Sequence, residues 1–198
     1  VSHNLTTIEA LANRVIVMDH GKLQFADTTE KSIAYYIESI VQDASRIPLR
    51  DREDRKGSGE AKITDIWFEN GEGQPVFEFR SGQAAAMCFK IESAVEIKNA
   101  DLAASVHRTD LSPVFRCSTR SCRQLPIIPK GTSQWRCYLP LVQLIPGSYP
   151  LTLIFRDHSE KVVDYITHAP SLEVIGGDFF GNGYVEMHSP MLVKHEWT

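Results

Sequence analysis

The sequence predicts a mainly-β fold in which an antiparallel β-sandwich follows a small α/β segment. Three observations lead to this class. Apolar residues recur at helical spacing only up to about residue 45. From residue 63 onward they alternate with polar residues in short runs, which is typical of half-buried strands. Glycine, proline and asparagine separate these runs at short intervals, as turns do in sandwiches.

The α/β segment is predicted to hold two helices around a pair of strands. Thr6 and Glu9 have the spacing of a capping box, so a helix is expected to begin there. Residues 15–18 and 22–26 have the pattern of two short strands joined by a turn. A second helix is expected to begin at Asp27. Its apolar stripe would need another domain or a second copy of the chain to pack on, and it consists of Ile33, Tyr36, Ile37, Ile40 and Val41.

Residues 46–62 combine a dense mixture of charges with a Gly-Ser-Gly sequence at 57–59. Because such a segment has few apolar side chains to bury, we expect it to be a linker. A charged strip for docking a partner is the alternative. The predicted organisation is an α/β segment at 1–45, a linker at 46–62 and a sandwich at 63–198.

The sandwich strands are predicted from the alternation and from turn signals such as Asn70-Gly71 and Pro146-Gly147. A domain of roughly 135 residues buries about two thirds of the surface that its unfolded chain exposes, which is enough for it to fold alone. The expected strands lie near residues 63–68, 83–93, 102–108, 113–117, 135–139, 148–156 and 161–168.

Composition narrows the classes of partner. The 198 residues are 42% hydrophobic and 23% charged, which is ordinary for a globular protein. The net charge is −4, and 21 basic residues are interleaved with 25 acidic ones, whereas a nucleic-acid ligand would need a basic face. No apolar run reaches the roughly 18–20 residues that cross a bilayer. We therefore expect no nucleic-acid partner, and a link to a membrane only through another protein.

The four cysteines are not spaced as in a disulfide scaffold or a structural zinc site. We expect them to be reduced, in a cytoplasmic protein that holds no metal. They are Cys88, Cys117, Cys122 and Cys137.

The first forty residues resemble the end of an ABC transporter nucleotide-binding domain. In that family a switch histidine senses the γ-phosphate of ATP, and a hairpin that turns at Gly-Lys follows. His3, Gly21 and Lys22 stand at the matching places, although Asn4 replaces the usual aspartate. The chain contains no P-loop, signature or Walker B motif. The resemblance thus implies a noncatalytic chain with no cofactor of its own, from a parent ATPase that binds ATP and magnesium.

A second resemblance covers the remaining residues. Leu141–Tyr149 forms a Leu-x-Pro-Gly-x-Tyr corner, and Leu172-Glu173-Val174 and Gly183-Tyr184-Val185 follow in order. This order is similar to the C-terminal domain of polysaccharide-exporting ABC transporter ATPase subunits, although residues 107–131 depart from the family pattern. The resemblance implies an immunoglobulin-like sandwich that recognises an exported glycan, such as O-antigen, on the cytoplasmic side. It also implies a transmembrane transporter subunit as a partner, with the chain peripheral at the inner membrane.

Candidate glycan-binding residues follow from the expected strand order. Sugars offer hydroxyls to polar side chains and weakly apolar C–H faces to aromatic rings. If the strands near 102–108, 113–117, 148–156 and 161–168 share one sheet, small residues lie beside long donors on its outer face. The alternative is that this face is only the solvated side of a sandwich. The candidates are Ser105, His107, Arg116, Thr152 and Arg156.

Two other functions remain open at this stage. The sandwich could be a structural dimerisation domain that never contacts sugar, and we expect a homodimer in which residues 184–197 pair with a sheet edge of the same or a neighbouring copy. A glycan-modifying enzyme is the other alternative. Asp157, His158, Ser159 and Glu160 include the residue types of a catalytic triad, but consecutive residues in a turn point apart, so a turn explains them more simply.

Overall fold

The computed structural model describes residue 8, residues 11–19 and residues 21–197. The chain divides into two compact units, Val1–Arg46 and Ile47–Thr198. His3, the expected nucleotide sensor, and most of the first expected helix lie outside the described residues. Among the described residues, no helix is both long enough and apolar enough to span a bilayer.

The first unit contains the expected strand pair and the second expected helix. Strands β1 (Arg14–Asp19) and β2 (Lys22–Thr28) pair antiparallel, and α2 (Thr29–Arg46) follows. The Ser32 hydroxyl donates a hydrogen bond of 3.0 Å to the Val15 carbonyl, which fixes the first turns of α2 against β1. Phe25 stacks on Tyr35 with ring centroids 4.6 Å apart. These contacts bear on the local fold only, and the ATPase origin of this unit stays a prediction.

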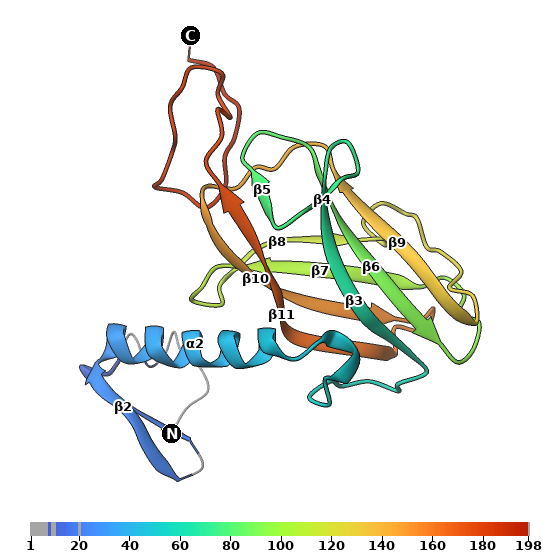
Figure 1. The fold of residues 1–198 in the computed structure, drawn as a ribbon, viewed down its shortest axis with the longest axis horizontal. Coiled ribbons are helices and arrows are strands. Elements are labelled where there is room, and N and C mark those ends of the chain that lie inside the picture. The colour runs from blue at the N-terminus through green and yellow to red at the C-terminus, as the bar shows by residue number, and fades with distance from the viewer. Residues whose placement is uncertain (1–7, 9–10, 20, 198) are drawn as a thin grey trace. The chain divides into compact units, whose positions relative to one another are not determined.

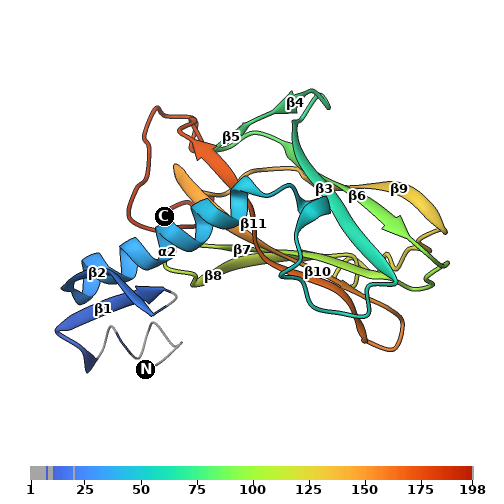
Figure 2. The same cartoon turned by 60° about the horizontal axis from the view of Figure 1, so that its bottom comes forward.

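The second unit is a sandwich of two sheets (Figure 1). The five-stranded sheet has the order β5-β11-β10-β7-β8 and the four-stranded sheet has the order β4-β3-β6-β9. Figure 2 shows the second sheet lying over the first. The predicted mainly-β sandwich is confirmed, with the one difference that β5 pairs parallel to β11. The bounds are β3 Ala61–Asn70, β4 Pro75–Val76, β5 Glu78–Arg80, β6 Ala85–Ser93, β7 Asp101–His107, β8 Pro113–Ser118, β9 Gly131–Leu139, β10 Gly147–Arg156 and β11 Val162–Ile175.

The core lies between the sheets because each strand turns alternate side chains inward. Neighbouring strands keep these side chains in register, as in the row of Ile66, Phe89 and Trp135. The predicted corner before β10 is present, since the Tyr149 phenol donates to the Ile145 carbonyl at 2.9 Å. The largest fully buried side chains include Phe79, Phe155, Met87, Ile91, Leu151, Leu153 and Ile166.

Residues 47–59 differ from the predicted linker because they pack on the sandwich. The backbone N–H groups of Lys56 and Ser58 donate to carbonyls of β11 at 3.0 and 3.1 Å, so this segment extends the five-stranded sheet. The Arg52 guanidinium donates to the Thr167 and His168 carbonyls at 2.8 Å each. Charged side chains therefore order this segment, because their donors have partners on the sandwich.

Residues 176–197 form irregular structure beyond β11, shown in red in Figure 1. Pairing of residues 184–197 with the described sandwich is limited to a bridge between Met191 and Leu144, beside which the Leu192 N–H donates to the Gln143 carbonyl at 2.8 Å. The sheet-edge strand expected over 184–197 is thus reduced to a single bridge in this chain.

Candidate functional site

The outer face of the five-stranded sheet brings together most of the predicted site residues. In the strand register, Ser105 of β7 lies opposite Arg116 of β8 on one side and Thr152 of β10 on the other. These three side chains form one row across the sheet, on the face that the core residues leave free. Arg116 is exposed, and Ser105 and Thr152 are half-buried. The expected sharing of one sheet by β7, β8, β10 and β11 is therefore confirmed.

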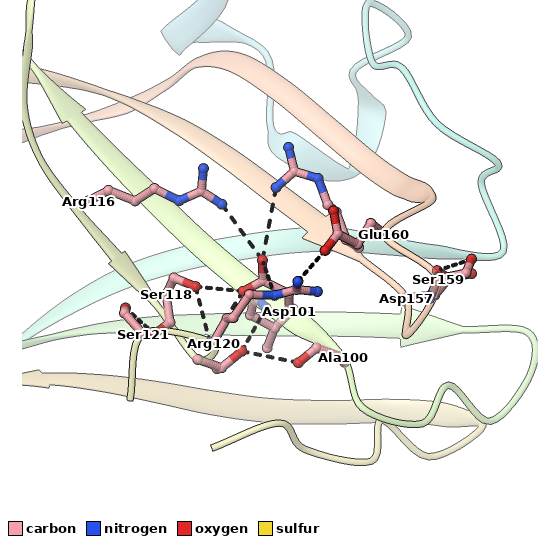
Figure 3. Close-up of polar contacts among 12 residues, drawn as sticks. Ala100, Asp101, Arg116, Ser118, Arg120, Ser121, Asp157, Ser159 and Glu160 are labelled. Atoms are coloured by element: carbon pink, nitrogen blue, oxygen red, sulfur yellow. Dashed lines mark hydrogen bonds and ion pairs between the residues drawn. The ribbon is translucent and has the colours of Figure 1, made fainter. Parts of the chain in front are cut away.

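Asp101 is the centre of a charged cluster at the end of this face (Figure 3). Its side chain is only 4% exposed, and Oδ2 lies 3.8 Å from Arg116, 3.7 Å from Arg120 and 3.9 Å from Arg156. The Ser118 hydroxyl donates to the other carboxylate oxygen at 2.6 Å. We call Asp101, Arg116, Arg120 and Arg156 the arginine cluster. The carboxylate holds all three guanidinium groups toward the same part of the sheet.

The arginine cluster retains hydrogen-bonding capacity and positive charge. Arg120 also pairs with Glu160 at 2.5 Å, so three guanidinium groups face two carboxylates. Each guanidinium has five N–H donors, and a single carboxylate shared by three of them cannot accept from most. The side chains of Arg116 and Arg156 are 40% and 28% exposed. The free donors can therefore bind hydroxyl or anionic oxygens of a ligand on the open face.

His107 differs from the other predicted residues in its surroundings. It lies at the end of β7 opposite Pro113, and its Nδ1 is 3.3 Å from the Leu111 carbonyl oxygen. Its Nε2 is buried without a hydrogen-bond partner among the described residues. His107 is half-buried, with Nε2 enclosed and Nδ1 directed at the Leu111 carbonyl, so its role in glycan binding stays a prediction.

Two residues of this face were missed by the sequence reasoning. Asp101 begins a strand, and nothing in the sequence pairs it with the arginines of β8 and β10. Tyr165 of β11 lies opposite Ile154, on the same face as Ala103, and it adds an aromatic ring beside the polar row. Its phase follows from the neighbouring core residue Ile166, which is the signal that could have found it.

The residues that resemble a triad form the turn between β10 and β11. The Asp157 carboxylate accepts hydrogen bonds from the Ser159 N–H and hydroxyl at 2.8 and 2.7 Å, and from the Lys161 N–H at 3.1 Å. The Asp157 carboxylate and the Ser159 hydroxyl are therefore used within the turn itself. Within the described part of the chain, no three His, Cys, Asp or Glu side chains lie close enough together to hold a metal ion.

Comparison with known proteins identifies the family of the second unit. Residues 52–187 match the model of the Wzt C-terminal domain. The chain belongs to this family. The Wzt C-terminal domain match begins at Arg52, inside the segment that packs on the sandwich, and leaves residues 1–51 unmatched. The resemblance to the C-terminal domain of polysaccharide-exporting ATPase subunits is thereby confirmed, whereas the ATPase remnant at 1–45 stays a prediction.

Solved structures support the same fold. A crystal structure of the C-terminal domain of Wzt superposes with a TM-score of 0.61 and 16% identity, covering 74% of this chain and 89% of that chain. The β-D-mannosidase of Dictyoglomus thermophilum gives 0.41 and 17%, with 60% and 14% covered. A Niemann-Pick type C2 protein from the Japanese carpenter ant gives 0.42 and 12%, with 61% and 98% covered. The latter two likenesses are too low to carry an argument, and no curated protein sequence matches the chain significantly.

Proposed function

We propose that this chain is the noncatalytic glycan-recognition module of an ABC transporter ATPase subunit, and that it selects an O-antigen-type polysaccharide for export. Membership of the Wzt C-terminal domain family supports this function. In the intact transporter, the parent ATPase would bind ATP and magnesium and would associate with a transmembrane subunit. The module would then work on the cytoplasmic side of the inner membrane.

The observation that carries the proposal is the open polar face of the five-stranded sheet. Arg116, Ser105 and Thr152 lie opposite one another in the register, and the Arg116 guanidinium reaches from that row toward Asp101, where Arg156 also pairs. Asp101 fixes the guanidinium groups before a ligand arrives, which reduces the entropy lost on binding. The small Ser105 and Thr152 side chains leave room above the sheet for a sugar chain, and the arginines can donate to its hydroxyls.

The test measures glycan binding by variants of this face. An array of purified bacterial O-polysaccharides identifies a ligand, and calorimetric titration then compares the unaltered chain with Arg116→Ala and Thr152→Ala. A hydrogen bond from a charged group is worth about 1.5–3 kcal/mol, so Arg116→Ala should weaken binding by roughly 10- to 100-fold. Arg50→Ala is the matched control, because Arg50 is also an exposed arginine paired with a carboxylate, Glu92, away from this face.

Two outcomes would contradict the proposal. If the folded chain retains no polysaccharide on the array, glycan recognition is wrong. If Arg116→Ala and Arg50→Ala bind alike, the assigned face is wrong. Release of reducing sugar during prolonged incubation would instead favour a glycan-modifying enzyme.

A structural dimerisation role is the second candidate, and the C-terminal segment favours it. Large apolar side chains are exposed there, including Trp197 at 92%, and their burial against a second copy would be favourable. We therefore propose a homodimer, which is compatible with glycan binding. Sedimentation that detects only monomers at high micromolar concentration would contradict it. The exposed set comprises Tyr184, Val185, Met187, Val193 and Trp197.

A further inference from the structure

The outer face of the four-stranded sheet carries an aromatic surface that the proposed function does not use. Side chains of β3, β6 and β9 that alternate with the core point to this face. One row across the three strands consists of Trp67, Cys88 and Arg136. The adjacent row consists of Glu69, Ala86 and Tyr138. Trp67 and Tyr138 therefore lie on β3 and β9, the two neighbours of β6, with small residues of β6 between them.

Glu69 connects the larger side chains of this surface. One carboxylate oxygen accepts a hydrogen bond of 3.0 Å from the Trp67 indole N–H. The other accepts one of 2.9 Å from Arg136, whose guanidinium carbon lies 5.5 Å from the centroid of the Tyr138 ring. We call Trp67, Glu69, Arg136 and Tyr138 the aromatic platform. Because each member is held by another, the rings are positioned before a ligand arrives.

The small residues of β6 let the platform lie close to the sheet. Ala86 and Cys88 are 0% and 2% exposed although they belong to the outer face, so larger neighbours cover them. Burial, together with a hydrogen bond to Glu69, raises the pKa of the Cys88 thiol to about 11, in agreement with a carboxylate placed over it. Tyr138 remains 51% exposed above this floor. Trp67 is half-buried, so the accessible part of the platform is mainly the Tyr138 ring with one side of the indole.

The charges of the platform indicate the chemistry of its ligand. Glu69 and Arg136 neutralise each other within the platform, so a charged ligand would find no free counter-charge there. The remaining features are aromatic surface and oriented polar groups, which together match the C–H faces and hydroxyls of an uncharged pyranose ring. The arginine cluster on the opposite sheet differs from this, since it carries an excess of positive charge.

We infer that the aromatic platform is a second saccharide-binding site, which takes a neutral pyranose ring by stacking on Tyr138 and Trp67. The platform lies on the other sheet from the face assigned under the proposed function, and Arg116 of that face lines one cavity with Arg136 and Tyr138 of the platform at the edge between β8 and β9. A glycan chain contacting both faces would be bound at two points, and its apparent affinity would exceed that of either point alone.

The experiment follows the Trp67 indole N–H by NMR in the full chain labelled with nitrogen-15, with the signal assigned from Trp67→Phe. The probes are the methyl pyranosides of glucose, mannose and galactose. At least one should shift this signal saturably. Loss of the stacking ring in Tyr138→Ala should weaken that binding about tenfold or more, whereas Tyr138→Phe should retain it. Phe77→Ala is the matched control, because Phe77 is an exposed aromatic residue between β4 and β5, outside both the platform and the C-terminal segment.

The inference is overturned if none of the three pyranosides shifts the signal or if Tyr138→Ala binds as well as the unaltered chain. A signal that shifts on dilution without sugar would identify a second copy of the chain as the occupant, which also overturns it. The two experiments distinguish failure of this inference from failure of the proposed function. Polysaccharide binding that is weakened by Arg116→Ala, with no response of the Trp67 signal to pyranosides, would contradict only the second site. A response of the Trp67 signal, with no effect of Arg116→Ala on polysaccharide binding, would contradict only the assigned face.

Discussion

The ion pair between Arg55 and Asp164 gives a prediction that tests the packing of residues 47–59. Arg55 Nη1 lies 3.0 Å from Asp164 Oδ2, and the two side chains are only 9% and 1% exposed. The same carboxylate oxygen accepts the Ile63 N–H at 2.8 Å. Arg55→Ala would leave this carboxylate buried without a counter-charge. Breaking a buried pair in this way costs about 3–5 kcal/mol, which is the expected loss in the free energy of unfolding at neutral pH.

This loss should shrink as the pH falls. Burial already raises the pKa of Asp164, and removal of the guanidinium would raise that pKa further. A carboxyl group whose pKa is higher in the folded state contributes most stability below its unfolded pKa of about 3.9, and that contribution is lost as the pH rises through the folded pKa. Arg55→Ala should therefore lie closer to the unaltered chain at pH 5 than at pH 7.5.

Urea unfolding followed by tryptophan fluorescence measures the effect, since Trp67 and Trp135 both belong to the sandwich. A domain of this size loses roughly 2–4 °C of melting temperature per kcal/mol, so thermal unfolding of Arg55→Ala should shift by about 6–20 °C. Arg50→Ala is the control, because its pair with Glu92 is exposed and worth less than about 1 kcal/mol. Equal, pH-independent effects of the two variants would refute the packing and would restore residues 46–62 as a linker.

Two further predictions concern the same edge of the sheet. Gly57→Ala should destabilise the chain by about 2 kcal/mol or more, because an added Cβ would overlap the Val163 carbonyl oxygen. Gly59→Ala should cost only about 1 kcal/mol, because a Cβ there meets no neighbouring atom. Equal losses of stability for the two variants in calorimetry would contradict this prediction. Burial lowers the pKa of His168, so its contribution to stability is present above its unfolded pKa of about 6.5 and is lost as the pH falls through the folded pKa. The urea midpoint of the unaltered chain should therefore decline between pH 7.5 and 5. His168→Asn should remove this decline, because asparagine tolerates the φ of +51° at this position and does not titrate. An unchanged decline in the variant would exclude His168 as its source.

Most of the fold could be predicted from the sequence because the sandwich strands are buried on one face. The alternation of apolar and polar residues locates each long strand, and Gly and Pro locate the turns. The Tyr149 corner also has a local signature, since its hydrogen bond closes within four residues. These features depend on neighbours in the sequence, which is why pattern alone identifies them.

The segment at 47–59 could not be predicted in this way because its partners are distant in the sequence. Arg52 and Arg55 contact β11 more than a hundred residues later. A run of charged residues normally indicates a solvated chain, and only the fold reveals carbonyl groups and the Asp164 carboxylate that accept these hydrogen bonds. The tertiary contacts of Arg52 and Arg55 therefore determine the structure of this segment, although its composition predicts a linker.

Only part of the candidate face could be predicted, because some of its contacts join segments that are distant in the sequence. The expected strand order brings Ser105, Arg116 and Thr152 into one row, because alternation fixes which side chains point outward. Asp101 could not be found, since its role depends on three arginines from other segments. Tyr165 could have been found from the sequence, because it lies in a regular stretch of the β10–β11 pairing next to the core residue Ile166.

The central claim is that the outer face of the five-stranded sheet binds a glycan without altering it. The most direct measurement is NMR shift mapping of the labelled chain with a polysaccharide identified on the array, followed by recovery of that polysaccharide. We predict that backbone amide shifts will centre on Ser105, Arg116 and Thr152, and that the polysaccharide will be recovered intact. Shifts confined to the C-terminal segment, or shortened polysaccharide after incubation, would contradict the claim.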